Sequence, residues 1–596
     1  MALSKITSAS LADNAVTSDK ISAGGIATVD MADGSVTSLK ILDGAIGAAD
    51  LNQSVDFTIN GLTVGRGASA VSTNTAVGAN ALAANTSGAE NVALGESALN
   101  ANTSGNYNTA IGRVASQLNT TGSANVSVGR QALNQNTTGS NNTAVGYTAL
   151  LSNTTADNNT AVGYQAGYSN TTGGITALGQ NAGFSNTTGL SNIAVGQAAL
   201  YSNTTANSNV AVGNFSQYPS TGSLNTSVGS SSLRFNTTGS QNTAVGTSAL
   251  FSNTTASNNT AVGYQAGYNN TTGYVNVFVG NKAGFSNTTG FANAVFGNNA
   301  GYALTSGVGN MFAGIRAGQS NTTGSANTFV GGSWSSYAGA SNTTGSNNTA
   351  IGTDALAANS TANNNTAVGF AALRDNTTGT LNVAVGESAL RGTTTGAKNT
   401  GIGEGAAYQS TTGEGITAVG YLAASNITSG HSGVYVGTNT LASGTGALWE
   451  VVIGANIYST VTGKGDSTGF IAPGGNGPVY QGNNSSTWST TSDRRLKKNI
   501  VDNTDGLNKI TAIRVRNFEY RLPEEVDAEL KPSDAIQKTG VQLGVIAQEL
   551  QEVLPDCVKQ ESTGVMSVDT DNLTWYLVNA IKELKAEFDA YKASHP

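Results

Sequence analysis

The dominant pattern in this chain is a short apolar segment that ends in glycine and returns every 17 residues. It begins as NTAVG at 74–78 and NVALG at 91–95 and continues to EVVIG at 450–454. There are 23 such glycines, with two spacings of 16 and one of 21 between Gly331 and Gly352. Each unit is too small to bury its own apolar strand, so we expect the units to stack on one another.

The residues between these strands indicate how each unit turns back on itself. A second apolar pair often appears, as in Ala149-Leu150. The closing glycine permits a positive φ, and turns such as Asn136-Thr137-Thr138-Gly139 offer side-chain bonds to the backbone. Equivalent asparagines would form ladders between units. The pattern predicts a parallel β-solenoid or β-roll, and 23 units would give a rod of ~110 Å at ~4.8 Å per unit.

The N-terminal part of the chain has a different period, with an apolar residue at every fifth position. This spacing matches neither a helix nor a strand, and it predicts a β-solenoid whose flat faces each take five residues. Segments such as LADNAVTSDKI and MADGSVTSLKI resemble pentad segments near the N-termini of phage fibres. The alternative is a weakly ordered arm. The ten residues in register are Ile6, Leu11, Val16, Ile21, Ile26, Met31, Val36, Ile41, Ile46 and Leu51.

The composition changes abruptly near the C-terminus. Charged residues make up only 10% of the chain, against about 25% in a typical globular protein. Of the 27 Lys and Arg, however, 14 lie between Arg494 and Lys592. We therefore expect five parts: an N-terminal attachment segment, a transition, the rod, an aperiodic neck and a small α/β domain, at 1–55, 56–72, 73–457, 458–491 and 492–596.

Charge and motif content exclude several functions. The net charge of −8 is small for 596 residues and argues against a nucleic-acid partner. Cys557 is the only cysteine, which excludes an internal disulfide framework and a multi-cysteine metal site. We expect no metal and no cofactor. No apolar stretch approaches the ~18 residues of a membrane span, and we expect no secretory signal. The Asn-x-Thr/Ser triplets are interpreted as turn chemistry rather than glycan acceptors.

The repeat N-[ST]-[VA]-A-[VI]-G over residues 73–457 resembles the head of YadA-like trimeric adhesins. Those heads are left-handed parallel β-rolls that trimerise along their axis, with shorter and less regular units. The resemblance therefore implies a homotrimeric fibre. We expect no membrane-anchor barrel of the kind that ends those adhesins, and this favours a virion fibre over a cell-surface adhesin.

The C-terminal domain carries a second set of motifs. They are Ser492-Asp493-x-Arg495-x-Lys497-x-Asn499-Ile500, then LGVIAQEL at 543–550, VLP at 553–555 and AIKEL at 580–584. Together they resemble the endosialidase-type intramolecular chaperone, the auto-processing domain that ends many phage tail fibres and spikes. The resemblance implies cleavage between Thr491 and Ser492, with Ser492 as the nucleophile and Lys497 as the general base. Asp493 would either orient this dyad or act as a local cap.

The implied chemistry places a condition on the lysine. An ordinary lysine has a pKa of about 10.4, so Lys497 would have to be desolvated, or lie among cations such as Arg494, Arg495 and Lys498, to accept a proton at neutral pH. We therefore expect the dyad to become competent only in the assembled trimer. His431 and His595, the two histidines of the chain, fall outside the motif.

The last helix predicted from the sequence carries apolar residues at spacings of 4, 3, 4 and 3, which is a heptad seam. We interpret it as a trimer seam; the alternative is a helix that packs within its own domain. The five seam residues are Leu577, Ile581, Leu584, Phe588 and Tyr591.

These observations together predict a mainly β, homotrimeric virion fibre of the tail, neck or head, assembled in the host cytoplasm. Its N-terminus would attach to a tail, neck or capsid protein, and the rod would adsorb to a host surface glycan or protein without membrane insertion. The alternatives are a bacterial trimeric surface adhesin and a tailspike with a glycan-degrading site between subunits. The predicted enzymatic activity is a single-turnover self-cleavage by the Ser-Lys dyad.

Overall fold

The structure is a computed structural model, and it divides the chain into two compact units, Met1–Thr491 and Ser492–Pro596. Each unit is described by itself below. The pentad segment predicted for 1–55 lies outside the described residues, and so do Thr491, Ser492 and Asp493. The described residues are 57–59, 62–454, 460–472, 479–481, 488–490, 494–527, 536, 538–560 and 565–596.

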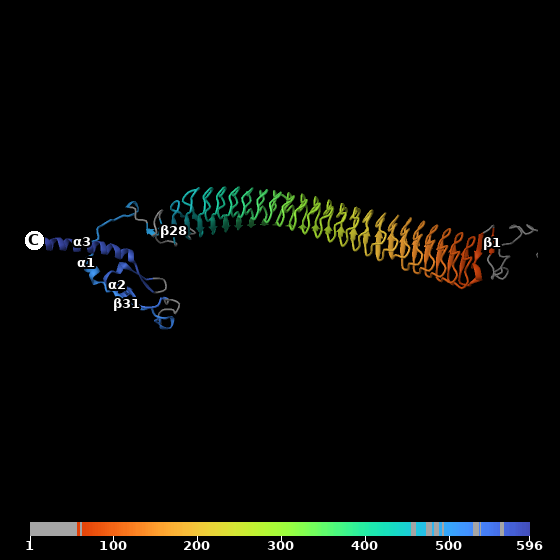
Figure 1. Cartoon of the computed structure of the whole chain (residues 1–596), viewed down its shortest axis with the longest axis horizontal. Helices are drawn as coiled ribbons and strands as arrows, with labels where there is room; N and C mark the ends of the chain where they lie inside the picture. The colour runs from red at the N-terminus through yellow and green to blue at the C-terminus, as the bar shows by residue number, and fades with distance from the viewer. Residues whose placement is uncertain are drawn as a thin grey trace, which may run out of the picture. The chain divides into compact units, whose positions relative to one another are not determined.

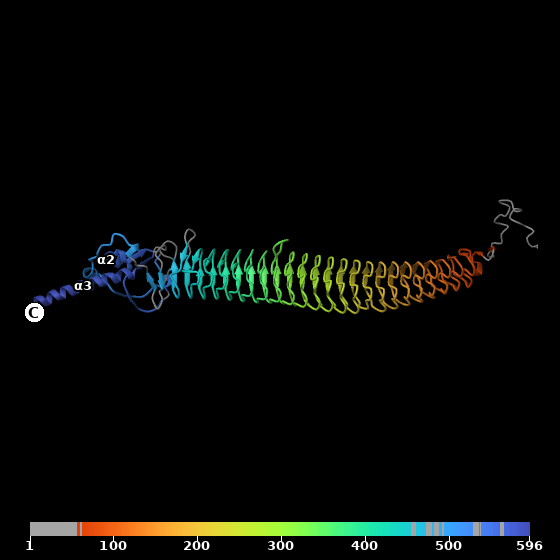
Figure 2. The same cartoon turned by 90° about the horizontal axis from the view of Figure 1, so that it is seen from above.

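The first unit is a long parallel β-solenoid with one short strand in each turn, or rung, of the chain (Figures 1 and 2). Neighbouring rungs pair in parallel and in register, as in Thr243↔Thr260 and Val245↔Val262. The predicted fold class is confirmed. The strands are β3 (Thr75–Val77), β4 (Val92–Leu94), β5 (Thr109–Ile111), β6 (Val126–Val128), β7 (Thr143–Val145), β8 (Thr160–Val162), β9 (Ile175–Leu178), β10 (Asn192–Val195), β11 (Val210–Val212), β12 (Thr226–Val228), β13 (Thr243–Val245), β14 (Thr260–Val262), β15 (Val277–Val279), β16 (Ala294–Phe296), β17 (Met311–Ala313), β18 (Thr328–Val330), β19 (Thr349–Ile351), β20 (Thr366–Val368), β21 (Val383–Val385), β22 (Thr400–Ile402), β23 (Thr417–Val419), β24 (Val434–Val436) and β26 (Val451–Gly454).

Short elements extend the solenoid at both ends. At the N-terminal end, β1 (Phe57–Ile59) and β2 (Leu62–Gly65) form an antiparallel hairpin that pairs with β3, and η5 (Ala68–Ala70) follows. At the C-terminal end, β25 (Thr440–Leu441) pairs with β27 (Val461–Thr462), and β28 (Gly469–Ala472) continues the parallel stack on β26. Two antiparallel strands, β29 (Val479–Gln481) and β30 (Trp488–Thr490), complete the sheet.

A typical strand turns one residue inward and two outward, because successive strand residues face opposite sides of a sheet. The inward residue is fully buried and is alanine in most rungs, for example Ala144 and Ala367. A second buried residue, typically a leucine such as Leu150 or Leu373, comes from the turn that follows the strand. The outward residues are mostly Thr, Val and Ile and are partly or fully exposed. The alanine before this leucine, such as Ala149, is buried as well. The solenoid core is therefore a thin layer in which three columns of side chains meet.

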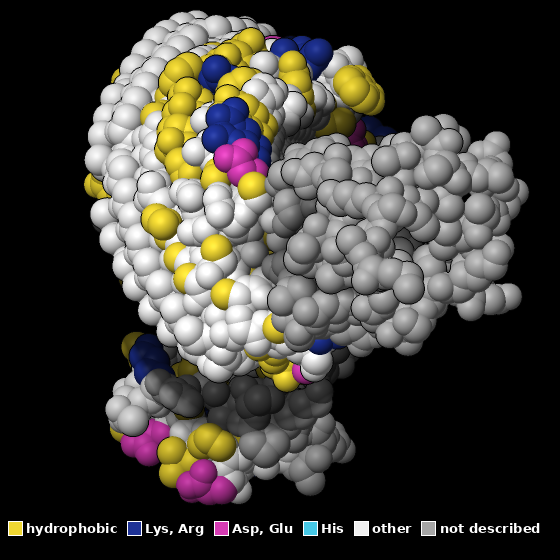
Figure 3. Space-filling view, turned by 90° about the vertical axis from the view of Figure 1, so that its right-hand side faces the viewer, with side chains coloured by type: hydrophobic (Ala, Val, Ile, Leu, Met, Phe, Trp, Pro, Cys, Tyr) yellow, Lys and Arg dark blue, Asp and Glu magenta, His cyan; other side chains and the backbone are white. Residues whose placement is uncertain are grey.

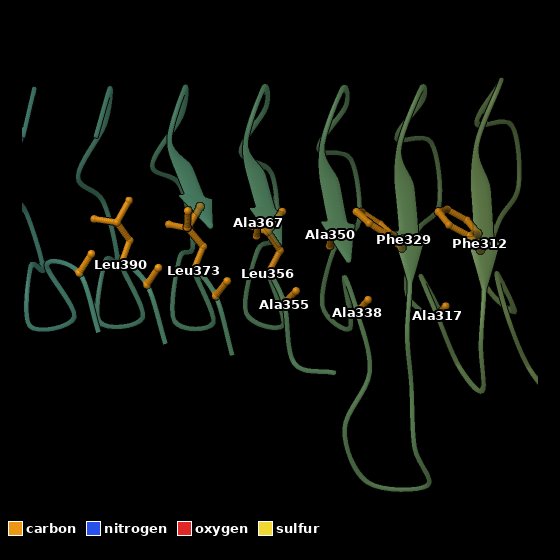
Figure 4. Close-up of a cluster of buried hydrophobic side chains, with 14 of the residues drawn as sticks. Phe312, Ala317, Phe329, Ala338, Ala350, Ala355, Leu356, Ala367, Leu373 and Leu390 are labelled. Carbon is orange, nitrogen blue, oxygen red and sulfur yellow. The ribbon is translucent and has the colours of Figure 1, made fainter. Parts of the chain in front are cut away.

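In the rungs with a buried phenylalanine, the strand column and the leucine column of the core compensate each other in volume. Where the inward strand residue is Phe312 instead of alanine, the leucine position of the same rung is Gly318. A Cβ atom on that glycine would lie 2.8 Å from the Phe312 ring. Figure 4 shows Phe312 and Phe329 in neighbouring rungs, and farther along the rod Leu356, Leu373 and Leu390 occupy the core instead. A side chain on the glycine would overpack the core, so the glycine makes room for the phenylalanine ring.

Two columns of buried asparagines run along the rod. In the first, Nδ2 of Asn136 donates to the Gly139 carbonyl of its own turn at 2.8 Å and to Oδ1 of Asn119 in the preceding rung at 2.7 Å. In the second, Oδ1 of Asn142 accepts from the backbone N–H of Asn159 at 2.9 Å. The predicted ladders are confirmed. They pair backbone groups that the turns bury away from water.

The glycine that closes a strand is required for two reasons. Gly146 has a φ of 136°, a conformation that side chains with a Cβ rarely adopt. A Cβ at this position would also clash with the carbonyl oxygen of Gly163 in the next rung, which would lie 2.3 Å away. The glycine therefore sets both the bend after the strand and the close spacing of the rungs.

A buried carboxylate closes the core near the C-terminal end of the solenoid. Glu450 is fully buried, and its two oxygens accept from the backbone N–H groups of Ser443 and Gly465, each at 3.0 Å. The Tyr435 hydroxyl lies 3.4 Å from the same carboxylate. Burial, together with the negative charge of Glu450, raises the pKa of Tyr435 far above its ordinary value, so the phenol stays protonated and can donate.

The second unit is a small α/β domain around a core of Leu550, Leu554, Cys557 and Tyr576. Burial raises the pKa of the Cys557 thiol, which makes this cysteine a core residue rather than a reactive one. The elements are η6 (Arg494–Leu496), α1 (Leu507–Ala512), β31 (Arg516–Phe518), η7 (Pro523–Glu525), β32 (Gln542–Gly544), α2 (Ala547–Val553), η9 (Pro555–Cys557), β33 (Val558–Gln560), β34 (Met566–Val568) and α3 (Thr570–Ser594).

Candidate autoprocessing and trimerisation site

The predicted general base lies directly after η6, at the start of the second unit. Lys497 is exposed, and its backbone N–H donates to the carbonyl of Arg494 at 3.2 Å, which closes a short turn. The neighbouring cations Arg494, Arg495 and Lys498 are exposed as well. The predicted nucleophile Ser492, the residue before it and Asp493 fall outside the described residues. The structure thus places the lysine and its cationic neighbours together on one short surface segment.

The LGVIAQEL motif forms a strand, a turn and a helix. Its first part is β32, which pairs with β31 in antiparallel fashion, and its second part opens α2. The Arg516 guanidinium binds the Glu549 carboxylate through two hydrogen bonds of 2.8 and 3.1 Å. The bond from Arg516 lowers the pKa of Glu549. Leu550 enters the core. Helix α2 is therefore held by the ion pair with β31 and by one buried side chain.

The start of α3 is anchored to the rest of this domain. Asp569 caps the helix, since its Oδ1 accepts from the N–H of Asp571 at 3.0 Å. Its other oxygen lies 2.6 Å from Nζ of Lys559 on β33, and this bond lowers the pKa of Asp569. The backbone N–H of Asp569 donates to the Cys557 carbonyl at 2.7 Å. The first turn of α3 is therefore held by three separate interactions.

One face of the N-terminal half of α3 packs within its own domain. Tyr576 and Ala580 are buried, and the Tyr576 hydroxyl donates to the Asp556 carboxylate at 2.8 Å. Nδ2 of Asn579 donates to the Asn503 carbonyl at 2.8 Å. A Cβ on Gly506 would lie 2.6 Å from the backbone nitrogen of Ala580, so the chain before α1 lies directly against this helix.

The predicted seam residues lie on a different face of α3, and all five are exposed in the single chain. Their exposed fractions range from 43% for Leu577 to 65% for Ile581. Beyond Ala580 no residue of this helix, which the structure describes throughout, is buried. The other three seam residues are Leu584, Phe588 and Tyr591. A row of large exposed apolar side chains on a helix is typical of an interaction surface.

A pocket of about 210 Å³ lies beside the anchored half of α3. No sequence pattern marks this pocket, because its lining comes from three segments that are far apart in the chain and share no motif. The lining residues are Asn503, Asp556, Asn572, Trp575, Tyr576 and Asn579.

The fold and this domain define a class of protein: a long parallel β-solenoid fibre with a small C-terminal α/β domain whose last helix has an exposed apolar face. Within that class, residues 492–559 match the family model of peptidase S74, described as the chaperone of endosialidase. The chain therefore carries a chaperone-of-endosialidase domain at its C-terminus, and the match begins at Ser492. Together with the solenoid, this family match supports a trimeric protein of the phage fibre or tailspike type.

No solved structure matches the chain. None of the described helices is long and apolar enough to cross a membrane.

Proposed function

We propose that this chain is the subunit of a homotrimeric virion fibre that adsorbs to the host cell. Its C-terminal chaperone aligns three chains and is then severed by cleavage between Thr491 and Ser492. The single observation that carries the proposal is the family match, which begins at Ser492. The N-terminal segment would attach the fibre to a tail, neck or capsid protein of the particle.

The outward face of the solenoid strands supports trimerisation of the rod. Thr, Val and Ile recur there along the rod, and side chains such as Leu94, Phe296 and Ile402 are among the exposed apolar residues. Seen from one end in Figure 3, hydrophobic side chains run in bands over a surface that is otherwise polar, with few charges. Monomeric proteins rarely leave so long an apolar surface open. Three copies packed along these faces would bury it.

The exposed seam of α3 supports a role in setting the register of the three chains. Strand pairing between distant or separate segments folds slowly and leaves unpaired edges open to aggregation. A solenoid with 23 nearly identical rungs could also pair with its neighbours in a shifted register. A parallel three-helix seam through Leu577, Ile581 and Leu584 would align the chains at one end before the rods pack.

The proposed cleavage is an acyl shift followed by hydrolysis. Lys497, in its neutral form, takes the proton of the Ser492 hydroxyl as Oγ attacks the Thr491 carbonyl carbon. The C–N bond then breaks, the amine of Ser492 receives the proton, and an ester joins the two residues through Oγ. Water hydrolyses the ester, which leaves a carboxylate on Thr491 and a free Ser492.

The exposure of Lys497 in the single chain supports a link between cleavage and assembly. A lysine acts as a general base when it is desolvated or surrounded by cations. The desolvation would come from the neighbouring chains, so a subunit that has not assembled would keep its chaperone. Once the chaperone has left, the rod has no template for refolding and becomes kinetically stable.

Denaturing gels of the full chain test the cleavage. The wild type is expected to yield a fragment spanning Ser492–Pro596, with Ser492 as its first residue by mass spectrometry. Ser492→Ala and Lys497→Ala should remain uncleaved, whereas the control variants Ser486→Ala and Lys538→Ala should cleave normally. Full-length wild-type chains that persist in assembled trimers would refute the autoproteolysis.

A further inference from the structure

The rod carries one insertion, which contains an exposed tryptophan. After β18, the chain takes 21 instead of 17 residues to reach the next closing glycine. The extra residues form a small loop in which Gly332 bridges Tyr337, and the Ser333 N–H donates to the Ser336 carbonyl at 2.7 Å. Figure 4 shows this loop continuing past the end of the strand that carries Phe329. Trp334 is 72% exposed, more than any other large apolar side chain in the described part of the rod.

A cationic side chain lies directly beneath the loop. Nη1 of Arg316 donates to the Trp334 carbonyl at 3.2 Å, and its guanidinium carbon lies 5.9 Å from the centre of the Tyr337 ring. Two buried polar atoms nearby, Nε of Arg316 and Oε1 of Gln319, have no hydrogen-bond partner among the described residues. Buried polar atoms in native proteins are normally paired. The open aromatic ring of Trp334 therefore lies beside a guanidinium whose hydrogen-bonding capacity is only partly used within the chain.

The charge on the N-terminal side of this loop has a single sign. Between Asp157 and Asp354 the sequence contains no Asp or Glu, although the whole chain has a net charge of −8. Lys282 and Arg316 occupy the same position in rungs two apart, which places them ~10 Å from each other along one edge of the rod. On the other side of the loop the charge is mixed, because Asp354 lies near an Arg374 that is already paired with Asp375 at 2.8 Å. The electrostatic potential along the edge from Lys282 to Arg316 favours an anionic ligand.

The other aromatic side chains of this region are not equally available. Tyr168, Phe184 and Tyr201 stack on one another along the rod, with ring centres 5.0 Å apart and nearly parallel planes. Each ring in this stack covers the face of its neighbour, so the stack stabilises the rod. Trp334 has no stacked partner among the described aromatic residues and is the ring most open to a ligand.

We infer that the Trp334 loop and the cations beside it form a binding site for an acidic polysaccharide. The indole face would pack against the C–H groups of a sugar ring, and Arg316 and Lys282 would contact carboxylate or other anionic groups of the sugar chain. The surrounding surface is rich in Asn, Thr and Ser, which suits hydroxyl-bearing ligands. With Arg234 there are three cations between Asp157 and Asp354, too few for a nucleic acid, whose binding requires many phosphate contacts.

This inference rests on the proposed function, since it names the ligand class of an adsorption fibre. It also agrees with the proposed trimer. The loop extends from the end of a strand, whereas the proposed subunit contact is the outward strand face, which repeats along the rod. An insertion present in one rung is compatible with an open edge of the rod but would separate subunits if it lay within that contact.

The test measures binding of the full-length purified fibre to a panel of immobilised acidic bacterial polysaccharides, with neutral dextran as the reference. We expect retention on at least one acidic polysaccharide, weakened by added salt, and none on dextran. Trp334→Ala and Arg316→Gln should each lower the affinity at least tenfold. The matched control is Trp449→Ala, a tryptophan that is 61% exposed elsewhere on the rod, and it should bind like the wild type.

Deleting residues 333–336 provides a second variant that restores the 17-residue spacing, and it should lose binding while remaining trimeric. The inference is overturned if no acidic polysaccharide is bound, if Trp334→Ala and Arg316→Gln bind normally, or if the loop variants lose their trimeric mass by light scattering. The last result would identify the loop as a subunit contact. Trimeric mass and cleavage, measured on the same samples, distinguish this failure from a failure of the proposed function.

Discussion

An exchange of volume between Phe312 and Gly318 tests whether the strand column and the leucine column of the solenoid core compensate each other. Phe312 is fully buried, and its ring covers the glycine of the same rung. In the rung of β20 the equivalent pair is Ala367 and Leu373, also fully buried. The double variant Phe312→Ala/Gly318→Leu would therefore give this rung the pair that another rung already uses.

The expected magnitudes follow from burial and geometry. Phe312→Ala alone should lower the free energy of local unfolding by about 3–5 kcal/mol, because it leaves a cavity in a rigid core. Gly318→Leu alone should cost about 1–3 kcal/mol through overpacking against the ring. Leu373 already has a φ of 49°, so a leucine is tolerated in this backbone conformation. The double variant should recover at least about 2 kcal/mol of the loss caused by Phe312→Ala.

Hydrogen exchange on the full-length fibre provides the assay, because repeat proteins open locally and each rung contacts only its neighbours. A recovery of about 2 kcal/mol corresponds to roughly 30-fold slower exchange in peptides covering residues 309–320. The reverse exchange, Ala367→Phe/Leu373→Gly, is the matched control and should be tolerated better than either of its single changes. If amide hydrogens in the Phe312→Ala/Gly318→Leu variant exchange as fast as in Phe312→Ala alone, the two positions do not compensate each other.

Three further predictions concern the ladder, the seam and the chaperone domain. Asn142→Ala should destabilise its rung by about 1–3 kcal/mol, because the buried N–H of Asn159 loses its acceptor. Unchanged amide hydrogen exchange in this rung would show that the ladder does not stabilise it. Ile581→Asp should yield monomers by light scattering, whereas Lys582→Ala, a change at an exposed position outside the seam, should leave the trimer intact. The Arg516 bond lowers the folded-state pKa of Glu549, so its stabilisation is present above the unfolded pKa of about 4.3 and is lost as pH falls through the folded value; Glu549→Gln should remove this pH dependence from denaturant melts.

The chaperone domain shows which parts of the candidate site could be recognised without a structure. The heptad spacing placed all five predicted seam residues on one exposed face of α3, since spacing alone defines one face of a helix. Tyr576 and Ala580 interleave with that seam, and no periodicity marks them as the face that packs on Asn503 and Gly506. That assignment depends on contacts between segments more than 70 residues apart.

The binding edge of the rod shows the same division. The spacing of 21 revealed an insertion, and the lack of acidic residues could be counted directly. The contact between Arg316 and Trp334, however, joins residues from two successive rungs, and it exists only because the rungs stack in register.

The rung, its turn and its asparagine ladders could all be predicted from the amino-acid order, because each is a local pattern that recurs too often along the chain to be accidental. The start of the C-terminal domain and the resemblance that carries the proposed cleavage were visible there too. The folded chain was needed to show which residue of each strand enters the core and which glycine makes room for a phenylalanine. Gly318 has the signature of an ordinary turn glycine, and its role becomes visible once the Phe312 ring is placed over it. The physical reason is that volume and hydrogen bonding are shared across the rod, between residues that no local pattern pairs.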